Sequence, residues 1–288
     1  FAERMRFGGY LAFIGLWSLL VYAPIAHWEW GGGFLGTGGV HAIDFAGGAV
    51  VHANAGAAAL AAAIYLGKRR GHGTEVLGHP HNVPFVVLGA GILWFGWFGF
   101  NAGSAFTSGA LASSALVNTQ LGAAAATLTW LVAERVRNGR VTTVGAATGA
   151  VAGLATITPA SGYVAPMSAL AIGAAAGILC FVAVGVKDRL GYDDSLDVVG
   201  VHMVGGILGV ILTGAFASLA INPAGAAASL TQVGRQVVLA GVTVGYSFVV
   251  TLVILKVVDV VMGLRLSGEH EDAGMDASLH GEVAYRTD

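Results

Sequence analysis

Eight long apolar segments follow one another along the chain, separated by short polar stretches. They cover residues 8–27, 44–67, 83–106, 111–134, 142–158, 164–186, 197–220 and 234–262. About 20 apolar residues are enough for a helix to cross a bilayer, and all but one of these segments have that length. The fifth is short and rich in glycine, so we expect it to be tilted, broken or only partly spanning. The pattern predicts an all-α polytopic membrane protein with about eight transmembrane helices.

The composition leads to the same class of protein. Of the 288 residues, 56% are hydrophobic and only 10% are charged, with a mean hydropathy of +0.75, whereas soluble proteins carry about 25% charged residues. The 45 glycines suit helices whose backbones approach closely. The single cysteine, Cys180, excludes an intrachain disulfide, and no basic stripe indicates nucleic-acid binding. Because the chain begins with Phe1 and shows no signal peptide, we expect it to be a fragment without its natural N-terminus.

The distribution of basic residues predicts how the chain crosses the membrane. Ten of the fourteen Lys and Arg residues lie in alternate loops, namely Arg4, Arg6, Lys68, Arg69, Arg70, Arg135, Arg137, Arg140, Lys187 and Arg189. The opposite loops, near 28–43, 107–110, 159–163 and 221–233, contain none. By the positive-inside rule we expect the basic loops to be cytoplasmic, together with the polar tail 263–288.

Two Asp/His pairs share one spacing. Asp44 and His52 are eight residues apart, and so are Asp194 and His202. Each aspartate stands where a predicted helix begins, so we expect it to act first as a helix cap, with Asp44 also attracting cations to an outer vestibule. Each histidine follows about 12 Å deeper. The loops place the two helix starts on opposite sides, which is the pattern of inverted repeats with a site at the midplane.

Histidines inside a membrane are costly and usually functional. Two neutral imidazoles can hydrogen-bond to one another and pass a proton without holding a stable charge. The alternative is that His52 and His202 are packing residues bonded to backbone or hydroxyl groups. A metal site at His79-Pro-His81 is weakly indicated, because no third ligand has a suitable spacing.

Aromatic residues gather at the outer ends of two segments. Trp30, followed by three glycines in the outer loop 28–43, fits either a membrane-belt anchor or a ring face for a cation. The stretch from Trp94 to Phe100 fits either packing or a hydrophobic constriction that strips water from a permeant. Ser104 follows it and carries a hydroxyl oxygen suited to an ammonium-like ligand.

Together these motifs resemble the Amt/MEP/Rh ammonium transporter family, and most closely its bacterial Amt-type members. The matching stretches cover nearly the whole chain and are Trp30-Gly-Gly-Gly, 44–52, 96–104, Asp194-x-x-Asp197-Val-x-Gly-Val-His202 and the tail residues 263–285. The resemblance implies a homotrimer of eleven-helix subunits, of which this chain holds helices four to eleven. It implies a transmembrane domain at 1–262, with a first-repeat remnant at 1–70, a second repeat at 83–220 and a last helix at 234–262. The tail 263–288 would be a cytoplasmic regulatory segment.

The resemblance also assigns roles to single residues. It implies that Trp30, Ser104 and Asp44 recruit ammonium, that Phe100 is one of two stacked gate phenylalanines, and that Trp97 lines the pore. The second gate phenylalanine would lie on a missing helix. His52 and His202 would be the paired pore histidines that relay the proton, and Asp194 a structural cap.

The expected function is therefore an ammonium transporter or channel in the cytoplasmic membrane. It would deprotonate ammonium and conduct ammonia, with methylammonium as an analogue and a PII-type signalling protein as a partner at the cytoplasmic face. We expect no cofactor, no metal, no nucleic acid and no enzymatic activity. Three alternatives stay open: an ammonium sensor, a neutral-gas channel of the Rh type, and an intramembrane metal-dependent hydrolase using His52, His202 and Asp197.

Overall fold

The computed structural model describes residues 1–73 and 80–285, and the regular structure of these residues is helical except for one isolated bridge between Met5 and Arg265. The elements include α-helices and single π-helical turns, labelled η. They are α1 (Phe7–Trp17), η1 (Ser18–Tyr22), α2 (Ala23–Trp30), η2 (Gly48–Ala53), α3 (Asn54–Leu66), α4 (Val83–Gly103), α5 (Ala110–Asn138), α6 (Thr143–Ile157), α7 (Pro166–Leu190), η4 (Val199–Met203), α8 (Val204–Phe216), α9 (Leu230–Met262), α10 (Gly268–Ala273) and η5 (Asp276–His280). His79, a residue of the weakly indicated metal site, lies outside the described residues, as do the last three residues of the tail.

Within the described part of the chain, seven helical runs are long and apolar enough to cross a membrane. They are Phe7–Trp30, Gly48–Leu66, Val83–Gly103, Ala110–Asn138, Pro166–Leu190, Val199–Phe216 and Leu230–Met262, and α6 is a shorter apolar helix. The predicted all-α fold with about eight membrane helices is confirmed, and the fifth segment is the short one, as expected.

The first predicted segment ends later in the structure than in the sequence analysis. Its helix continues to Trp30, so the prediction that Trp30 lies in a loop is wrong. The π turn η1 comes directly before α2, whose second residue is Pro24. A proline removes a backbone donor, and a local change of hydrogen-bond register lets the helix continue past it.

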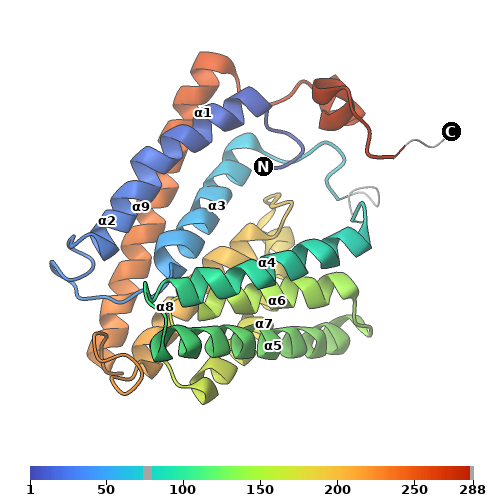
Figure 1. Cartoon of the computed structure of the whole chain (residues 1–288). Coiled ribbons are helices and arrows are strands. Elements are labelled where there is room, and N and C mark those ends of the chain that lie inside the picture. The colour runs from blue at the N-terminus through green and yellow to red at the C-terminus, as the bar shows by residue number, and fades with distance from the viewer. Residues whose placement is uncertain (74–79, 286–288) are drawn as a thin grey trace.

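The helices form two groups that meet in the middle of the molecule (Figure 1). Helices α1, α3 and α8 pack against the long helix α9, while α4, α5, α6 and α7 pack against one another. Helix α8 also contacts α6 and α7, so it joins the two groups.

Two segments cross at the junction of these groups, and each begins with a π turn. The turn η2 packs against α8, the turn η4 packs against α3, and the two turns touch. Because the start of each segment lies beside the continuation of the other, the segments η2–α3 and η4–α8 run antiparallel. Single π turns are rare and occur often at functional sites.

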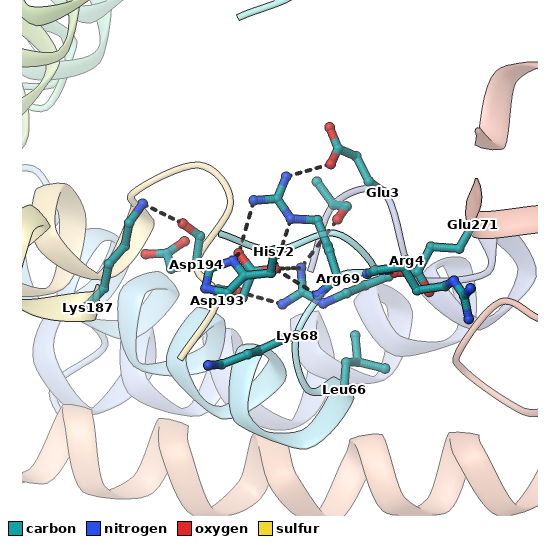
Figure 2. A network of polar contacts seen from close by, with 12 residues as sticks. Glu3, Arg4, Leu66, Lys68, Arg69, His72, Lys187, Asp193, Asp194 and Glu271 are labelled. Carbon is teal, nitrogen blue, oxygen red and sulfur yellow. Dashed lines mark hydrogen bonds and ion pairs between the residues drawn. The ribbon is translucent and has the colours of Figure 1, made fainter. Parts of the chain in front are cut away.

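A polar network joins three loops at the end of α3 (Figure 2). Arg69 binds Asp193 with two guanidinium hydrogen bonds of 2.9 and 3.0 Å and reaches Glu3 at 2.5 Å. Arg4, which is fully buried, donates to the carbonyl oxygen of Asp193 at 2.6 Å. The network fixes the first loop and the α7–η4 loop against the end of α3.

The tail lies against the same region. Arg265 donates to the carbonyl oxygens of Leu66 and Lys68, both at 2.6 Å, and forms an ion pair with Glu271. The side chain of Ser267 caps α10. The polar tail expected from the sequence therefore contains regular structure, in α10 and η5. Its Arg265 packs on the loop after α3.

Candidate functional site

The site centres on the two histidines of the crossing π turns. Nδ1 of His52, in η2, lies 3.2 Å from Nδ1 of His202, in η4, and the ring centroids are 5.3 Å apart. His52 is 4% exposed. Residues 150 positions apart in the chain thus form one hydrogen-bonded imidazole pair.

Thr158, just after α6, determines how that pair carries its protons. Its hydroxyl donates to the carbonyl oxygen of Leu154 at 2.7 Å, so its only proton is used. The same oxygen accepts from Nε1 of Trp97 at 2.9 Å and lies 3.3 Å from Nε2 of His52. His52 must therefore donate from Nε2, which in a neutral ring leaves Nδ1 as the acceptor.

The partner ring follows from this assignment. Because Nδ1 of His52 accepts, Nδ1 of His202 donates, and the neutral ring of His202 has its Nε2 lone pair left for a ligand. All the hydrogen bonds of the pair can be made without a charge on either ring. The local network thus orders both tautomers.

Aromatic rings of α4 pack against the ring of His52. The ring of Trp97 stacks on it at 5.1 Å with an interplanar angle of 26°, and the ring of Phe100 lies 6.1 Å away. Both belong to α4, one turn apart, where they contact each other edge to face at 5.9 Å. The sequence-predicted Trp97, Phe100, His52 and His202 are therefore brought together.

A cavity continues beyond His202 between α4, α6 and η4. Its volume is about 380 Å³, and its lining is mostly apolar, with His202, Thr148, Phe85, Leu93 and Val201 among the residues. Such a lining offers few groups that could replace the hydration shell of an ion.

Asp44 holds the start of η2 from a position four residues ahead of it. The sequence predicted that this helix starts at Asp44, but it starts at Gly48. The carboxylate of Asp44 accepts four backbone N–H bonds, from residues 47–50, at distances between 2.7 and 3.1 Å. One carboxylate thus satisfies the N–H groups that a helix start leaves free.

Trp30 is the last residue of α2, and Ser104 directly follows α4. Nε1 of Trp30 donates to the carbonyl oxygen of Asp44 at 2.7 Å, while the ring keeps 45% of its surface exposed. The hydroxyl of Ser104 donates to the carbonyl oxygen of Phe100 at 2.9 Å. Trp30 is thereby joined to Asp44, whereas no hydrogen bond among the described residues joins Trp30 to Ser104.

In the second Asp/His pair, the aspartate caps its helix with fewer hydrogen bonds than in the first. The carboxylate of Asp194 accepts one N–H bond, from Val199 at 2.7 Å, so it holds the start of η4 with fewer bonds than the Asp44 carboxylate uses for η2. Asp197 forms an ion pair with Lys187 and adopts a left-handed φ of 58°. In the described part of the chain no group of three His, Cys, Asp or Glu side chains is arranged to hold a metal ion.

Two glycines let the crossing segments approach. Gly56 and Gly206 each stand four residues after a histidine. A Cβ on Gly56 would lie 2.4 Å from the backbone nitrogen of Met203, and one on Gly206 would lie 2.5 Å from the carbonyl oxygen of Gly48. Neither contact tolerates a side chain, so these positions set the distance between the histidine-bearing turns.

Sequence reasoning missed Thr158, Gly56 and Gly206. The equal offset of the glycines from the histidines was a readable signal in a chain of 45 glycines. Thr158 gave none, because its role depends on a side chain 106 positions away.

Comparison with known proteins gives consistent matches. The sequence profile described as Ammonium Transporter Family matches residues 1–285. An ammonium transporter from Mycobacterium tuberculosis is 50% identical over 301 residues, which cover 99% of this chain and 63% of that protein. One from Bacillus subtilis is 46% identical over 291 residues, covering 99% of this chain and 71% of that protein.

Solved structures match as well. Candida albicans Mep2 has a TM-score of 0.85 at 40% identity, covering 93% of this chain and 61% of that one. A structure described as a sensor Amt protein has a TM-score of 0.88 at 33% identity, covering 96% of this chain and 71% of that one. The chain thus spans less than two thirds of the length of the mycobacterial relative and of Mep2.

Proposed function

We propose a function from one premise: this chain belongs to the Ammonium Transporter Family. The protein recruits ammonium at the entrance formed by Trp30, Ser104 and Asp44. Ammonium loses its proton there, and ammonia passes Phe100 and the pair of His52 and His202. The hydrogen bond between the two imidazoles is the observation that carries the proposal.

A neutral imidazole pair suits the passage of ammonia. The lone pair on Nε2 of His202 can accept an N–H group from ammonia, and His202 lines the cavity beyond. Apart from these nitrogens and a few hydroxyls, the surroundings are apolar. A molecule with several N–H groups and no charge matches such a path.

Selectivity follows from the energy of dehydration. Moving a small ion from water into an apolar interior has an idealised cost of order 20 kcal/mol. Potassium can enter the apolar passage only as an ion, with the full cost of dehydration. Ammonium can lose a proton to the external water and enter as neutral ammonia. Deprotonation at the entrance therefore separates the two ions before either reaches Phe100.

Variants of the histidines test the proposal. In His52→Ala and His202→Ala, we expect the intact protein in liposomes to lose selective uptake of labelled methylammonium or to change the current that accompanies uptake. His270→Ala, on the exposed helix α10, is the control and keeps both. Unchanged, ammonium-selective currents in both pore variants would rule the proposal out.

The remaining assignments belong to the same proposal. The protein forms a homotrimer in the cytoplasmic membrane with its C-terminus inside, and a PII-type signalling protein binds at the cytoplasmic face. The basic loops and the tail packed on the loop after α3 support this orientation. A Ser278→Cys variant tests the orientation when a membrane-impermeant thiol reagent is added to either side of sealed vesicles. Labelling only from the outside would contradict it.

An ammonium sensor is the second candidate, favoured by the likeness to the sensor Amt structure. In a sensor, ligand binding would move the tail. A crosslink between the tail and the loop after α3 whose yield changes with ammonium, in a protein that takes up no methylammonium, would favour this candidate.

A further inference from the structure

Glu29 is an acidic side chain that the proposed passage does not use. It lies in the last turn of α2 and is 6% exposed. It stands one turn after Ile25, which belongs to the main hydrophobic core, so both face the interior. No described residue hydrogen-bonds to its buried Oε2.

A buried carboxylate in this situation has to be neutralised. An ionised carboxylate without partners costs several kcal/mol to bury, and a proton or a cation removes that cost. The carboxyl group of Glu29, next to Trp30, is therefore expected to carry either a proton or a nearby cation.

The neighbours of Glu29 favour a proton in the empty state. Asp44 is close enough to act on it electrostatically, and four backbone N–H bonds stabilise the ionised form of Asp44. Two carboxylates close together in a dry site do not both ionise readily. Tyr163, from the loop after α6, also interacts electrostatically with both carboxylates. Helix α9 directs the neutral amides of Gln232 and Gln236 to carbonyl oxygens of the loop between α2 and η2, and the charged Arg235 of α9 donates to the Gln232 amide oxygen at 3.1 Å.

The buried acid is connected to the exposed entrance through Trp30. Trp30 follows Glu29 in the chain, and its indole N–H donates to the carbonyl oxygen of Asp44. The exposed ring of Trp30 offers a face for a cation. A cation on that face would stand on the residue next to Glu29 and on the indole that binds the main chain of Asp44.

We propose that Glu29 is a proton-binding group of the ammonium entrance, protonated when the entrance is empty and ionised when a cation binds beside Trp30. On binding, the O–H bond of the Glu29 carboxyl breaks, its proton passes to external water, and the carboxylate that remains is balanced by the bound cation. The inference rests on the proposed function in that the cation is ammonium.

Reciprocal coupling follows from this linkage. If the cation weakens proton binding at Glu29, loss of the proton strengthens cation binding by the same factor. The apparent affinity for ammonium-like cations therefore rises with external pH, typically by about tenfold for a coupling of ordinary size.

Proton release measures the linkage directly. Methylammonium is added to the purified intact protein in a weakly buffered solution that contains a pH-sensitive dye. We expect the unaltered protein to release protons in proportion to the methylammonium bound, and Glu29→Gln to bind methylammonium with this release lost. Glu134→Gln is the matched control, since Glu134 is also buried but both its oxygens already accept from Thr142.

A second measurement follows uptake. In liposomes, the KM for methylammonium of the unaltered protein and of Glu134→Gln should fall about tenfold as external pH rises over the range where methylammonium stays protonated. Glu29→Gln should keep a nearly constant KM. A Glu29→Gln protein with the pH profile and the proton release of the unaltered protein overturns the inference.

The two proposals fail in different ways. If neither the unaltered protein nor either variant takes up methylammonium, the proposed transport function fails. The proton-release measurement then still tests the role of Glu29. If uptake is normal and the pH profiles of all three proteins coincide, only the role of Glu29 fails. If the Glu29→Gln protein elutes as aggregate, Glu29→Ala takes its place; it should bind methylammonium without proton release, and release equal to that of the unaltered protein overturns the inference.

Discussion

Oγ1 of Thr158 lies 3.3 Å from Nε2 of His52, and this contact assigns the protons of the whole imidazole pair. The hydroxyl proton of Thr158 is already bound to the carbonyl oxygen of Leu154. Thr158 is thus a pure acceptor toward His52 and Trp97, and the order of donors continues to His202. A single hydroxyl oxygen orients two rings that belong to different segments.

Thr158→Val should disrupt this order. The change leaves Nε2–H of His52 and Nε1–H of Trp97 without their acceptor, at a cost of about 1–3 kcal/mol for each buried donor left unpaired. We expect a lower unfolding temperature and a several-fold lower rate of methylammonium uptake. Thr213→Val is the control, because the Thr213 hydroxyl is equally buried and donates to the carbonyl oxygen four residues earlier. Equal losses in both variants would mean that Thr158 acts only as a helix residue.

The two aspartates at the starts of the crossing segments should differ in importance. The carboxylate of Asp44 accepts four backbone N–H bonds, and the carboxylate of Asp194 accepts one. Loss of an ordinary cap costs about 1 kcal/mol, and each further buried N–H group left unpaired adds about 1–3 kcal/mol. We therefore expect Asp44→Ala to lower the free energy of unfolding clearly more than Asp194→Ala. Thermal unfolding of both variants in the same detergent checks the order, and a larger loss for Asp194→Ala would contradict it.

The sequence was most informative about features that repeat at a fixed local spacing. Asp44/His52 and Asp194/His202, together with the alternation of basic loops, predicted two antiparallel segments, and the contacts of η2 with α8 and of η4 with α3 have this arrangement. Apolar segment length gave the number of helices because the bilayer sets a minimum length. These are properties that each segment has on its own.

The sequence was least informative where a role depends on a distant partner. Thr158 ends a segment rich in glycine and alanine, and nothing local distinguishes it from other threonines. Glu29 lies between two tryptophans in a stretch interpreted as an outer loop, so its burial could not be expected. The first segment was predicted to end at residue 27, whereas the helix continues past Pro24 to Trp30.

Close packing at the crossing gives a third prediction. Gly56→Ala and Gly206→Ala each place a methyl group within 2.5 Å of backbone or Cβ atoms of Met203 or Gly48. Overpacking of this kind costs about 1–3 kcal/mol, and the shift should also lengthen the contact between the histidines. Gly245→Ala in α9 is the control, since nothing lies within 4 Å of its added Cβ and alanine favours a helix over glycine. Unfolding temperature and methylammonium uptake should fall together in the first two variants and hold in the control.

The network around Asp193 should make stability depend on pH at the acidic end. Burial alone would raise the pKa of the Asp193 carboxyl, but hydrogen bonds from the Arg69 side chain and backbone, and the charges of Arg69 and Arg4, hold that pKa well below its usual value. A carboxyl with a lower pKa in the folded state than in the unfolded chain stabilises the fold above the unfolded value, about 3.9. The stabilisation is lost as pH falls below that value toward the folded pKa.

Asp193→Asn tests this dependence because it removes the carboxylate charge, so that Glu3 remains as the ion-pair partner of Arg69. Breaking one side of a buried ion pair costs about 3–5 kcal/mol, so we expect a large loss of stability at neutral pH. The difference between the variant and the unaltered protein should shrink as pH is lowered below about 4, because Asp193 then becomes protonated in the unaltered protein as well. Asp272→Asn is the control, since its ion pair with Arg70 is more than half exposed and should contribute nothing measurable. Unfolding midpoints measured from neutral pH down to about pH 3 decide the matter, and a difference for Asp193→Asn that stays constant over that range would show that its carboxylate charge does not stabilise the fold.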